Sequence, residues 1–461
     1  MIDDTIAAIS TPPGEGGIGI VRVSGPLTQQ IVTTLFSFAQ PMERISSHRL
    51  YYGKIVDPAD GHAVDEALVS LMRAPHTYTR EDVAEFNCHG GIMPLAKTLE
   101  LILAQGARLA EPGEFTQRAF LNGRIDLAQA EAVIGMIRAR SEAAMHVSMS
   151  QLTGRLSGEI RQIRRTLLAV LAHMEASIDF PEHQDVEEFA LDEVRKGAEK
   201  GLNDTEQLLE TADRGRILRE GIRTAIIGRP NVGKSSLLNA MLREQRAIVT
   251  DIPGTTRDVL EESINLGGVA LTIVDTAGIR ETMDEVEKIG VARSRAAIGE
   301  ADLILYMMDI TQKPSRDDLD ILRDAKDKPS IVIVNKTDLL ADIDETVKKI
   351  EKKVSPLPVL PVSVTENRGL AELEKLIISL VFQGDVRAPQ SAMVTSARHK
   401  DALRRSRQSL VDLLAALDAG YALDLLAIDL HAALDALGEI TGETVGADLA
   451  AEIFSTFCIG K

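Results

Sequence analysis

Short apolar runs alternate with polar turn residues through the first 120 residues of the chain, which is typical of strands in a compact α+β unit. The runs that predict strands are 18–23, 50–56, 67–72 and 83–86, and the stretches that predict helices are 29–38 and 95–103. We therefore expect residues 1–120 to form an N-terminal α+β domain.

The pattern then changes to that of long amphipathic helices. Apolar residues from Leu152 to Ile178 recur mostly at spacings of three and four, and Pro181 ends this stripe. A second helix-like run reaches about residue 219, and leucine stripes return after Gly384. Because each apolar face must be buried, these regions are predicted to form one helical domain, residues 121–220 plus 385–461.

A third pattern separates the two helical regions. Apolar strand-like runs alternate there with helix-like segments, which is typical of a doubly wound parallel sheet. The predicted strands are 225–227, 271–274, 303–308, 331–334 and 359–364. The predicted fold is therefore multidomain, α/β and α, with a Ras-like doubly wound domain at 221–384 inserted into the helical domain.

Composition narrows the possible function classes. A net charge of −18 argues against nonspecific coating of nucleic acid, because that affinity comes from cations that neutralise phosphates. With 3% aromatic residues, an extended base-stacking platform is not expected, and two cysteines exclude a disulfide framework or a Cys-rich zinc site. The N-terminus lacks signal-peptide character, and no apolar run approaches about 18 residues. We expect a cytoplasmic protein that does not enter a membrane.

The clearest chemical motif follows the first strand of the inserted domain. Residues 228–235 read G-x-x-x-x-G-K-S, a phosphate-binding loop, and a helix is predicted directly after it. Backbone N–H groups and the helix N-terminus favour the negative charge of phosphates. Lys234 is expected to reach the β- and γ-phosphates, and Ser235 is expected to bind Mg²⁺. The predicted nucleotide contacts here are Asn231, Val232, Gly233, Lys234, Ser235 and Ser236.

Three further motifs occur in the order that a GTPase requires: 275–278 (DTAG), 335–338 (NKTD, the guanine motif) and 363–365 (SVT). Asp338 can accept two N–H bonds from guanine, which adenine does not offer, so the nucleotide is predicted to be GTP. Thr256 is placed to complete the coordination of Mg²⁺. Ser363 precedes Val364 where alanine is usual, a departure that affects one base contact. The remaining predicted contacts are Thr250, Asp251, Ile252, Pro253, Gly254, Thr255, Asp275, Thr276, Ala277, Gly278, Asn335 and Lys336.

The residue after the Asp275–Gly278 motif is unusual. Ras-like GTPases place a glutamine there to orient water, but this chain has Ile279. Either hydrolysis is very slow or another group supplies this function. Glu287, one or two turns beyond the motif, is the candidate catalytic residue. Its alternative interpretation is a solvated carboxylate on a helix face.

Several longer stretches resemble the bacterial tRNA-modification GTPase family known as MnmE or TrmE, over essentially the whole chain. The stretches that carry the resemblance are 11–22 (TPPGEGGIGIVR), 111–120 (EPGEFTQRAF), 126–132 (DLAQAEA) and the ending 457–461 (FCIGK). The four GTPase motifs are shared by many proteins. The two N-terminal stretches and the Cys-Ile-Gly-Lys ending are far more specific.

The resemblance implies a set of ligands. The family's N-terminal domain binds a 5-formyltetrahydrofolate-type carrier, whose contacts fall on Arg22, Glu85, Arg124 and Lys461; some relatives carry lysine at position 124. Without the family resemblance, the favoured interpretation of Arg22 and Glu85 is a structural ion pair on a sheet edge. The family's K⁺, which could stabilise transition-state charge as an arginine would, falls on Asn231, Thr250, Ile252 and Thr255.

The resemblance also implies partners: a homodimer joined through the N-terminal domains, and the FAD-containing protein MnmG (GidA) in a heterotetramer. That complex modifies C5 of the wobble uridine of certain tRNAs with an aminomethyl or carboxymethylaminomethyl group. The basic runs 161–165 and 398–407 are either tRNA contacts or solvated helix faces. Cys458 is interpreted as a structural thiol rather than a nucleophile, and Cys88 and His89 lack partners at metal-binding spacing.

Two other functions compete with this one. A regulatory GTPase that acts as a switch in ribosome assembly would share the GTPase motifs, but it usually carries a nucleic-acid-binding module that this sequence lacks. A folate-binding scaffold with a vestigial GTPase is disfavoured because the GTPase motifs are intact.

Overall fold

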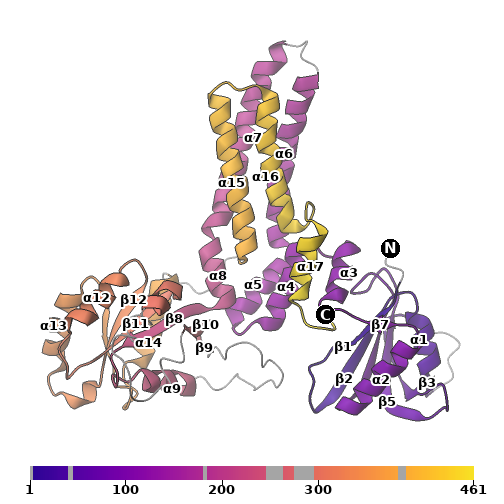
Figure 1. Cartoon of the computed structure of the whole chain (residues 1–461), viewed down its shortest axis with the longest axis horizontal. Coiled ribbons are helices and arrows are strands. Elements are labelled where there is room, and N and C mark those ends of the chain that lie inside the picture. Colours follow the sequence, from indigo (N-terminus) through magenta and orange to yellow (C-terminus); the bar gives the residue numbers. More distant parts are fainter. Residues whose placement is uncertain (1–3, 40–44, 180–183, 245–262, 275–294, 383–390) are drawn as a thin grey trace.

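The computed structural model describes residues 4–39, 45–179, 184–244, 263–274, 295–382 and 391–461. A bundle of long helices stands between an α+β unit and an α/β unit (Figure 1). The predicted fold class is confirmed, including the α/β unit inserted between two groups of helices that share one core. No helix in the described residues is long and apolar enough to cross a membrane.

The N-terminal unit is built on a sheet with the strand order β3-β4-β5-β6-β2-β1-β7. All of its neighbouring strands are antiparallel except β1 and β7. Helices α1 and α2 pack on one face, where their apolar side chains join the core of the sheet. The elements are β1 (Ile6–Ile9), β2 (Gly16–Ser24), α1 (Thr28–Leu35), β3 (Phe36–Phe38), β4 (Arg49–Val56), β5 (Ala63–Met72), β6 (Val83–Gly90), α2 (Ile92–Ala104), β7 (Arg108–Leu109) and α3 (Glu114–Leu121).

The helix predicted over residues 29–38 ends earlier than expected. Residues 36–38 instead form β3, which pairs with β4 so that Phe36 lies opposite Ile55. Phe38 also makes an edge contact with Tyr51, with ring centroids 5.8 Å apart. These cross-strand aromatic contacts stabilise an extended conformation, and the local sequence pattern does not reveal them.

The helical domain is made from segments before and after the α/β unit. Helices α6, α7, α15 and α16 pack side by side as a bundle (Figure 1). Its core contains Leu167 from α6 and Leu410 from α15, so both parts of the chain share one interior. The elements are α4 (Leu127–Arg138), α5 (Glu142–Leu152), α6 (Arg155–Asp179), α7 (Gln184–Glu210), α8 (Ala212–Glu220), α15 (Ala397–Asp418), α16 (Leu423–Thr441) and α17 (Ala447–Ser455).

The apolar stripe that begins at Leu152 is not one continuous helix. Leu152 ends α5 and Arg155 begins α6, with Gly154 between them at a φ of +83°. This backbone conformation is readily adopted only by glycine and ends a helix.

The α/β unit contains a sheet with the order β13-β12-β11-β8-β10-β9. All pairs are parallel except the β9–β10 hairpin, and β9 was not predicted from sequence. Strand β13 is shorter than the predicted run 359–364 and ends at Pro361. The elements are β8 (Ile222–Gly228), α9 (Lys234–Glu244), β9 (Ser263–Leu266), β10 (Val269–Val274), β11 (Leu303–Asp309), α12 (Arg316–Asp324), β12 (Ser330–Asn335), α13 (Ile343–Val354), β13 (Val359–Pro361) and α14 (Leu370–Phe382).

Specific contacts join the three units. Against the α/β unit, the N–H of Ala143 in α5 donates to the carbonyl of Gly268 at 3.2 Å, and Arg216 of α8 pairs with Asp302 at 2.6 Å. Against the N-terminal unit, Phe454 and Phe457 pack in a core with residues of α3 and α4. The Gly460 carbonyl accepts bonds from Ser10 and Arg22, each at 3.1 Å, so the last residues of the chain lie beside its first strands.

Candidate functional site

The phosphate-binding loop lies where β8 ends and α9 begins, at the carboxyl edge of the parallel sheet, which is where open α/β sheets bind ligands. The Lys234 ammonium donates to the carbonyls of Gly228 at 2.7 Å and Arg229 at 2.9 Å. Burial lowers the pKa of Lys234. The loop therefore holds its own lysine through main-chain oxygens.

Only glycine fits at position 233, because the phosphate-binding loop lies against Asn335 of the guanine motif and leaves no space for a side chain. Its φ is +106°, and a Cβ there would lie 2.3 Å from Nδ2 of Asn335. Asn335 uses that amide to donate to the carbonyl of Val232 at 2.8 Å. Two motifs separated by about 100 residues of sequence are thus brought into direct contact.

The residues expected to recognise guanine lie together at the ends of β12 and β13. Ser363 Oγ donates to Oδ1 of Asp338 at 2.6 Å, which orients the carboxylate predicted to bind the base. The N–H of Val364 donates to Oδ1 of Asn335 at 3.3 Å. This contact uses the main chain, so the valine that replaces the usual alanine leaves it in place.

Asp309 was not identified from sequence. It ends the buried strand β11, and its Oδ2 lies 2.7 Å from the ammonium of Lys336. Thr311 donates to its other oxygen from N at 2.9 Å and from Oγ1 at 2.6 Å. Burial alone would raise the pKa of Asp309, but the bonds from Lys336 and Thr311 lower it and keep it ionised. The sequence feature that could have identified Asp309 is a carboxylate at the end of an otherwise apolar strand.

Part of the predicted site lies outside the described residues. This applies to the contacts expected before β9, to the motif expected after β10, and to the candidate catalytic glutamate. These residues are Thr250, Asp251, Ile252, Pro253, Gly254, Thr255, Thr256, Asp275, Thr276, Ala277, Gly278, Ile279 and Glu287.

The four predicted folate residues come from distant parts of the sequence, and the structure links them. Arg22 of β2 forms an ion pair with Glu85 of β6 at 2.8 Å, and these residues lie opposite each other in the strand register. The same guanidinium donates to the carbonyl of Gly460 at 3.1 Å, which places Lys461 next to the pair. Burial and the nearby charge of Arg22 lower the pKa of Lys461.

Arg124 joins this cluster through Tyr78. Its guanidinium lies 4.7 Å from the centre of the Tyr78 ring and donates to the Tyr78 carbonyl at 3.3 Å. Arg22 lies 5.9 Å from the same ring. The two arginines therefore contact one aromatic residue that the sequence analysis did not identify.

The side chains of the stretch 126–132 bond other parts of the chain, at the start of α4 and in α15. Asp126 caps α4 together with Gln129, each side chain bonding the other's backbone N–H. Glu131 forms an ion pair with Arg398 at 2.7 Å, and its other oxygen lies 2.9 Å from Nε2 of His399. Burial alone would raise the pKa of Glu131, but His399 and Arg398 lower it to about 2. This motif therefore joins α4 to α15.

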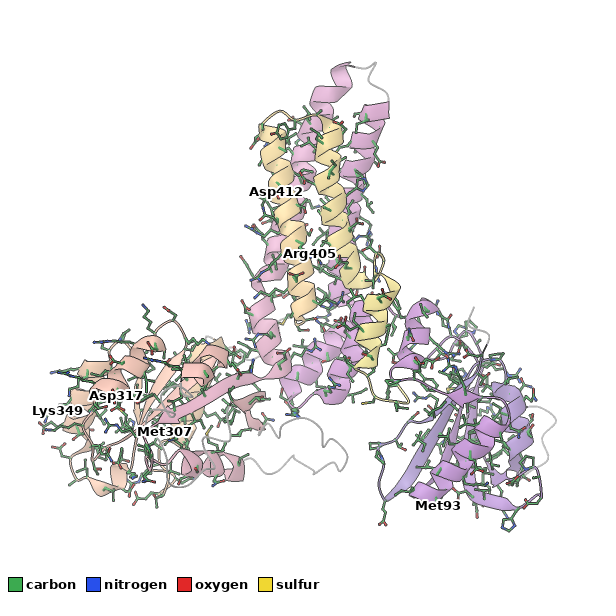
Figure 2. All side chains as sticks on the ribbon, in the orientation of Figure 1. Met93, Met307, Asp317, Lys349, Arg405 and Asp412 are labelled. Carbon is green, nitrogen blue, oxygen red and sulfur yellow. The ribbon has the colours of Figure 1, made fainter. Side chains whose placement is uncertain are left out.

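The two basic runs are largely paired with carboxylates of the same chain. In the run 398–407, Arg405 binds Glu439 at 2.6 Å, and Figure 2 shows it on the helical bundle. In the run 161–165, Arg161 binds Asp126 at 2.5 Å. Arg164, Lys400 and Arg407 have acidic partners as well. This pairing favours the interpretation of these runs as helix faces that stabilise the bundle.

The two cysteines lie in different environments. Cys88 is buried, and burial raises its pKa to about 11, so the thiol is protonated and unreactive at neutral pH. Cys458 is exposed, and its carbonyl accepts a bond from the N–H of Gly113 at 3.3 Å.

Comparisons with known proteins cover the full length. Residues 5–124 match the family described as GTP-binding protein TrmE N-terminus, and residues 127–458 match the MnmE helical domain. The chain is 50% identical to the tRNA modification GTPase MnmE of Thermoanaerobacter pseudethanolicus over 100% of both chains. It is 51% identical to that of Geobacillus thermodenitrificans over 99% of both. Among solved structures, the FeoB G domain of Methanococcus jannaschii is 28% identical, with a TM-score of 0.26, over 35% of this chain and 97% of that one.

Proposed function

We propose, because this chain belongs to the MnmE family of tRNA modification GTPases, that its GTP cycle drives modification of C5 of the wobble uridine in certain tRNAs. The chain is a GTPase, and tRNA is the substrate that its family name implies. The added group would be aminomethyl or carboxymethylaminomethyl, installed together with an FAD-containing MnmG partner. The observation that carries this proposal is full-length similarity combined with a formed phosphate-binding loop and guanine motif.

The described residues support specific roles in GTP binding. The loop backbone from Asn231 to Gly233 and the first turn of α9 would hold the phosphates, since both offer N–H groups. Lys234 uses two of its three N–H donors on the carbonyls of Gly228 and Arg229, so the third would donate to phosphate oxygens, which are strong acceptors because they are charged. Asp338, oriented by Ser363, would accept the guanine N–H groups. Family membership also disfavours a ribosome-assembly switch as the function.

Two cations fit the donor set of the loop. Ser235 lies in the first turn of α9 beside the proposed phosphate position, so its hydroxyl suits Mg²⁺, which prefers oxygen ligands and substrate phosphates. Asn231 is exposed and has a φ of +63°, and its side-chain oxygen suits K⁺. Bound there, these cations would neutralise charge on the phosphates. Their other proposed ligands, Thr256 for Mg²⁺ and Thr250, Ile252 and Thr255 for K⁺, lie outside the described residues.

We expect GTP hydrolysis to be several-fold faster in K⁺ than in Na⁺ at equal ionic strength. The reason is that Ile279 cannot orient water and a suitably placed K⁺ would stabilise the transition state. Initial rates of phosphate release in the two salts measure this effect. Asn231→Ala should abolish the difference, whereas Asn367→Ala, which alters another positive-φ asparagine of the same domain, should preserve it. Equal rates in both salts would contradict the K⁺ proposal.

We also propose that the Arg22–Glu85 cluster binds a formyl-tetrahydrofolate-type donor. The cluster offers a carboxylate for a pterin amide and cations for the carboxylates of a folate. Tyr78 adds an aromatic surface between the two arginines. Lys461 adds an ammonium whose partial burial makes a charged ligand a favourable partner.

The face of the N-terminal sheet that carries this cluster supports the proposed homodimer. Ser70, Glu85 and Arg22 form one row across β5, β6 and β2, on the face opposite α1 and α2. Tyr52 and Leu68 lie opposite each other on the same face and are 54% and 39% exposed. Apolar residues gathered on an uncovered face are typical of an interface. We propose that a second copy of the chain covers them.

Lys461→Ala should weaken folate binding at least about tenfold, because a charge-assisted contact is worth roughly 1.5–3 kcal/mol. Affinity for GDP should not change, since Lys461 lies in a different unit from the phosphate loop. Calorimetry with 5-formyltetrahydrofolate and with GDP measures both. Lys97→Ala, an exposed lysine of the same unit that pairs with Glu100, is the matched control. Unchanged folate affinity in Lys461→Ala would exclude this residue from the site.

A further inference from the structure

We propose that Asp318 is a positioning residue for the phosphate-binding loop, which it holds from behind through the side chain of Arg229. This inference rests on the proposed role of that loop in binding GTP. Asp318 lies in the first turn of α12, outside all four GTPase motifs. Its side chain is 6% exposed, and that of Arg229 is 35% exposed.

Two hydrogen bonds join the guanidinium of Arg229 to the carboxylate of Asp318, and we call this bidentate pair the clamp. Arg229 Nε donates to Oδ1 of Asp318 at 3.0 Å, and a second guanidinium nitrogen bonds Oδ2. A bidentate pair of this kind fixes direction as well as distance. The Arg229 guanidinium also donates to the side-chain oxygen of Gln312 at 3.3 Å. The arginine is therefore held by the chain between β11 and α12.

Asp318 is itself fixed and ionised. The Tyr306 hydroxyl donates to its Oδ1 at 2.8 Å, and the Ser315 N–H donates to its Oδ2 at 2.7 Å. Burial alone would raise the pKa of Asp318, but the bonds from Ser315, Tyr306 and Arg229 lower it. A buried, charged and fully bonded carboxylate is a rigid anchor. Removing the Arg229 guanidinium would leave the buried negative charge of Asp318 without a cationic partner.

The consequence for the nucleotide site follows from the main chain of Arg229. Its carbonyl oxygen is one of the two acceptors that hold the Lys234 ammonium, at 2.9 Å. Arg229, Met307 and Asp318 also help to line one small pocket beside the loop. Figure 2 places Met307 inside the α/β unit. Without the clamp, the guanidinium no longer fixes residue 229, and the carbonyl that positions Lys234 is free to shift.

The clamp therefore pre-organises the loop for phosphates without touching them. Pre-organisation lowers the cost of ordering a loop on binding, so its loss should appear in affinity rather than in turnover. Arg229→Gln should raise the Kd for GDP and the KM for GTP about tenfold, the loss typical of one charged hydrogen-bonded contact, and leave kcat within about twofold.

The experiment is a double-mutant cycle on the full-length protein, with GDP affinity, steady-state GTP hydrolysis and thermal unfolding as measurements. Asp318→Asn should weaken GDP binding as much as Arg229→Gln does, and the double variant should lose little more. Arg323→Gln, which removes an arginine from the exposed face of α12, is the matched control and should keep wild-type affinity. Wild-type protein that binds no GDP would instead overturn the proposed function.

A second measurement does not depend on how well Asp318→Asn folds. In nucleotide-free Arg229→Gln, hydrogen exchange of the amides of residues 229 and 231–234 should be faster than in wild type, because the clamp acts before nucleotide binds. If affinity falls but this exchange is unchanged, Arg229 contacts the nucleotide directly and the positioning role is wrong. Wild-type affinity in Arg229→Gln would also overturn it.

Discussion

Glu287→Ala is expected to hydrolyse GTP at least about a hundredfold more slowly than the wild-type protein, even in K⁺, because loss of one general-base contribution typically costs about 10²–10⁴-fold. Ile279 cannot orient water, so another polar group must, and we expect Glu287 to act through an intervening water. GTP affinity should remain close to that of wild type, since Glu287 is not among the residues proposed to hold the phosphates.

Single-turnover hydrolysis with saturating protein separates this effect from binding and product release. Glu285→Ala, which removes a neighbouring carboxylate, serves as the matched control and should keep the wild-type rate. If Glu287→Ala turned over GTP within about threefold of wild type, Glu287 would be a solvated carboxylate without a catalytic role.

Lys234→Ala should have the other large effect, a fall in GTP turnover of about 10²–10³-fold, which is the range for removing one preorganised electrostatic contact to the reacting group. In contrast to Glu287→Ala, it should also weaken GDP binding, because the proposed role of this ammonium is to contact phosphates in both the ground state and the transition state. Equilibrium binding of a fluorescent GDP analogue, together with initial rates, measures both quantities.

Lys349→Ala is the matched control for the loss of a lysine. Its ammonium pairs with Glu345 on the exposed surface of α13. Figure 2 labels Lys349 at the outer side of the α/β unit. We expect its binding and turnover to equal those of wild type. A Lys234→Ala protein that kept wild-type GDP affinity would contradict the assignment of residues 228–235 as the phosphate site.

The phosphate loop could be predicted from sequence because its functional groups are contiguous. Lys234 and Ser235 follow a strand and begin a helix, and that local context is readable directly. The alternation of apolar runs was also enough to predict the inserted doubly wound unit. The shared helical core followed from the need of two amphipathic regions to bury their apolar faces.

Contacts between distant elements were not readable in the same way. Asp309 reaches Lys336 only because the β11–β12 register places it opposite Asn335. Asp318 reaches Arg229 only because α12 packs behind the loop. Arg22 bonds the Gly460 carbonyl across 438 residues of sequence. Strand register and helix docking determine these contacts, and neither leaves a periodic signal at the residues involved.

The central claim is that this GTPase cycle drives modification of the tRNA wobble uridine. Nucleoside mass spectrometry of tRNA from cells that lack the protein, complemented with wild type, Lys234→Ala or Glu287→Ala, tests it most directly. We predict that the C5-modified wobble uridines disappear in the deletion, return with the wild-type chain, and stay absent with both variants. Unchanged wobble uridines in the deletion strain would contradict the claim.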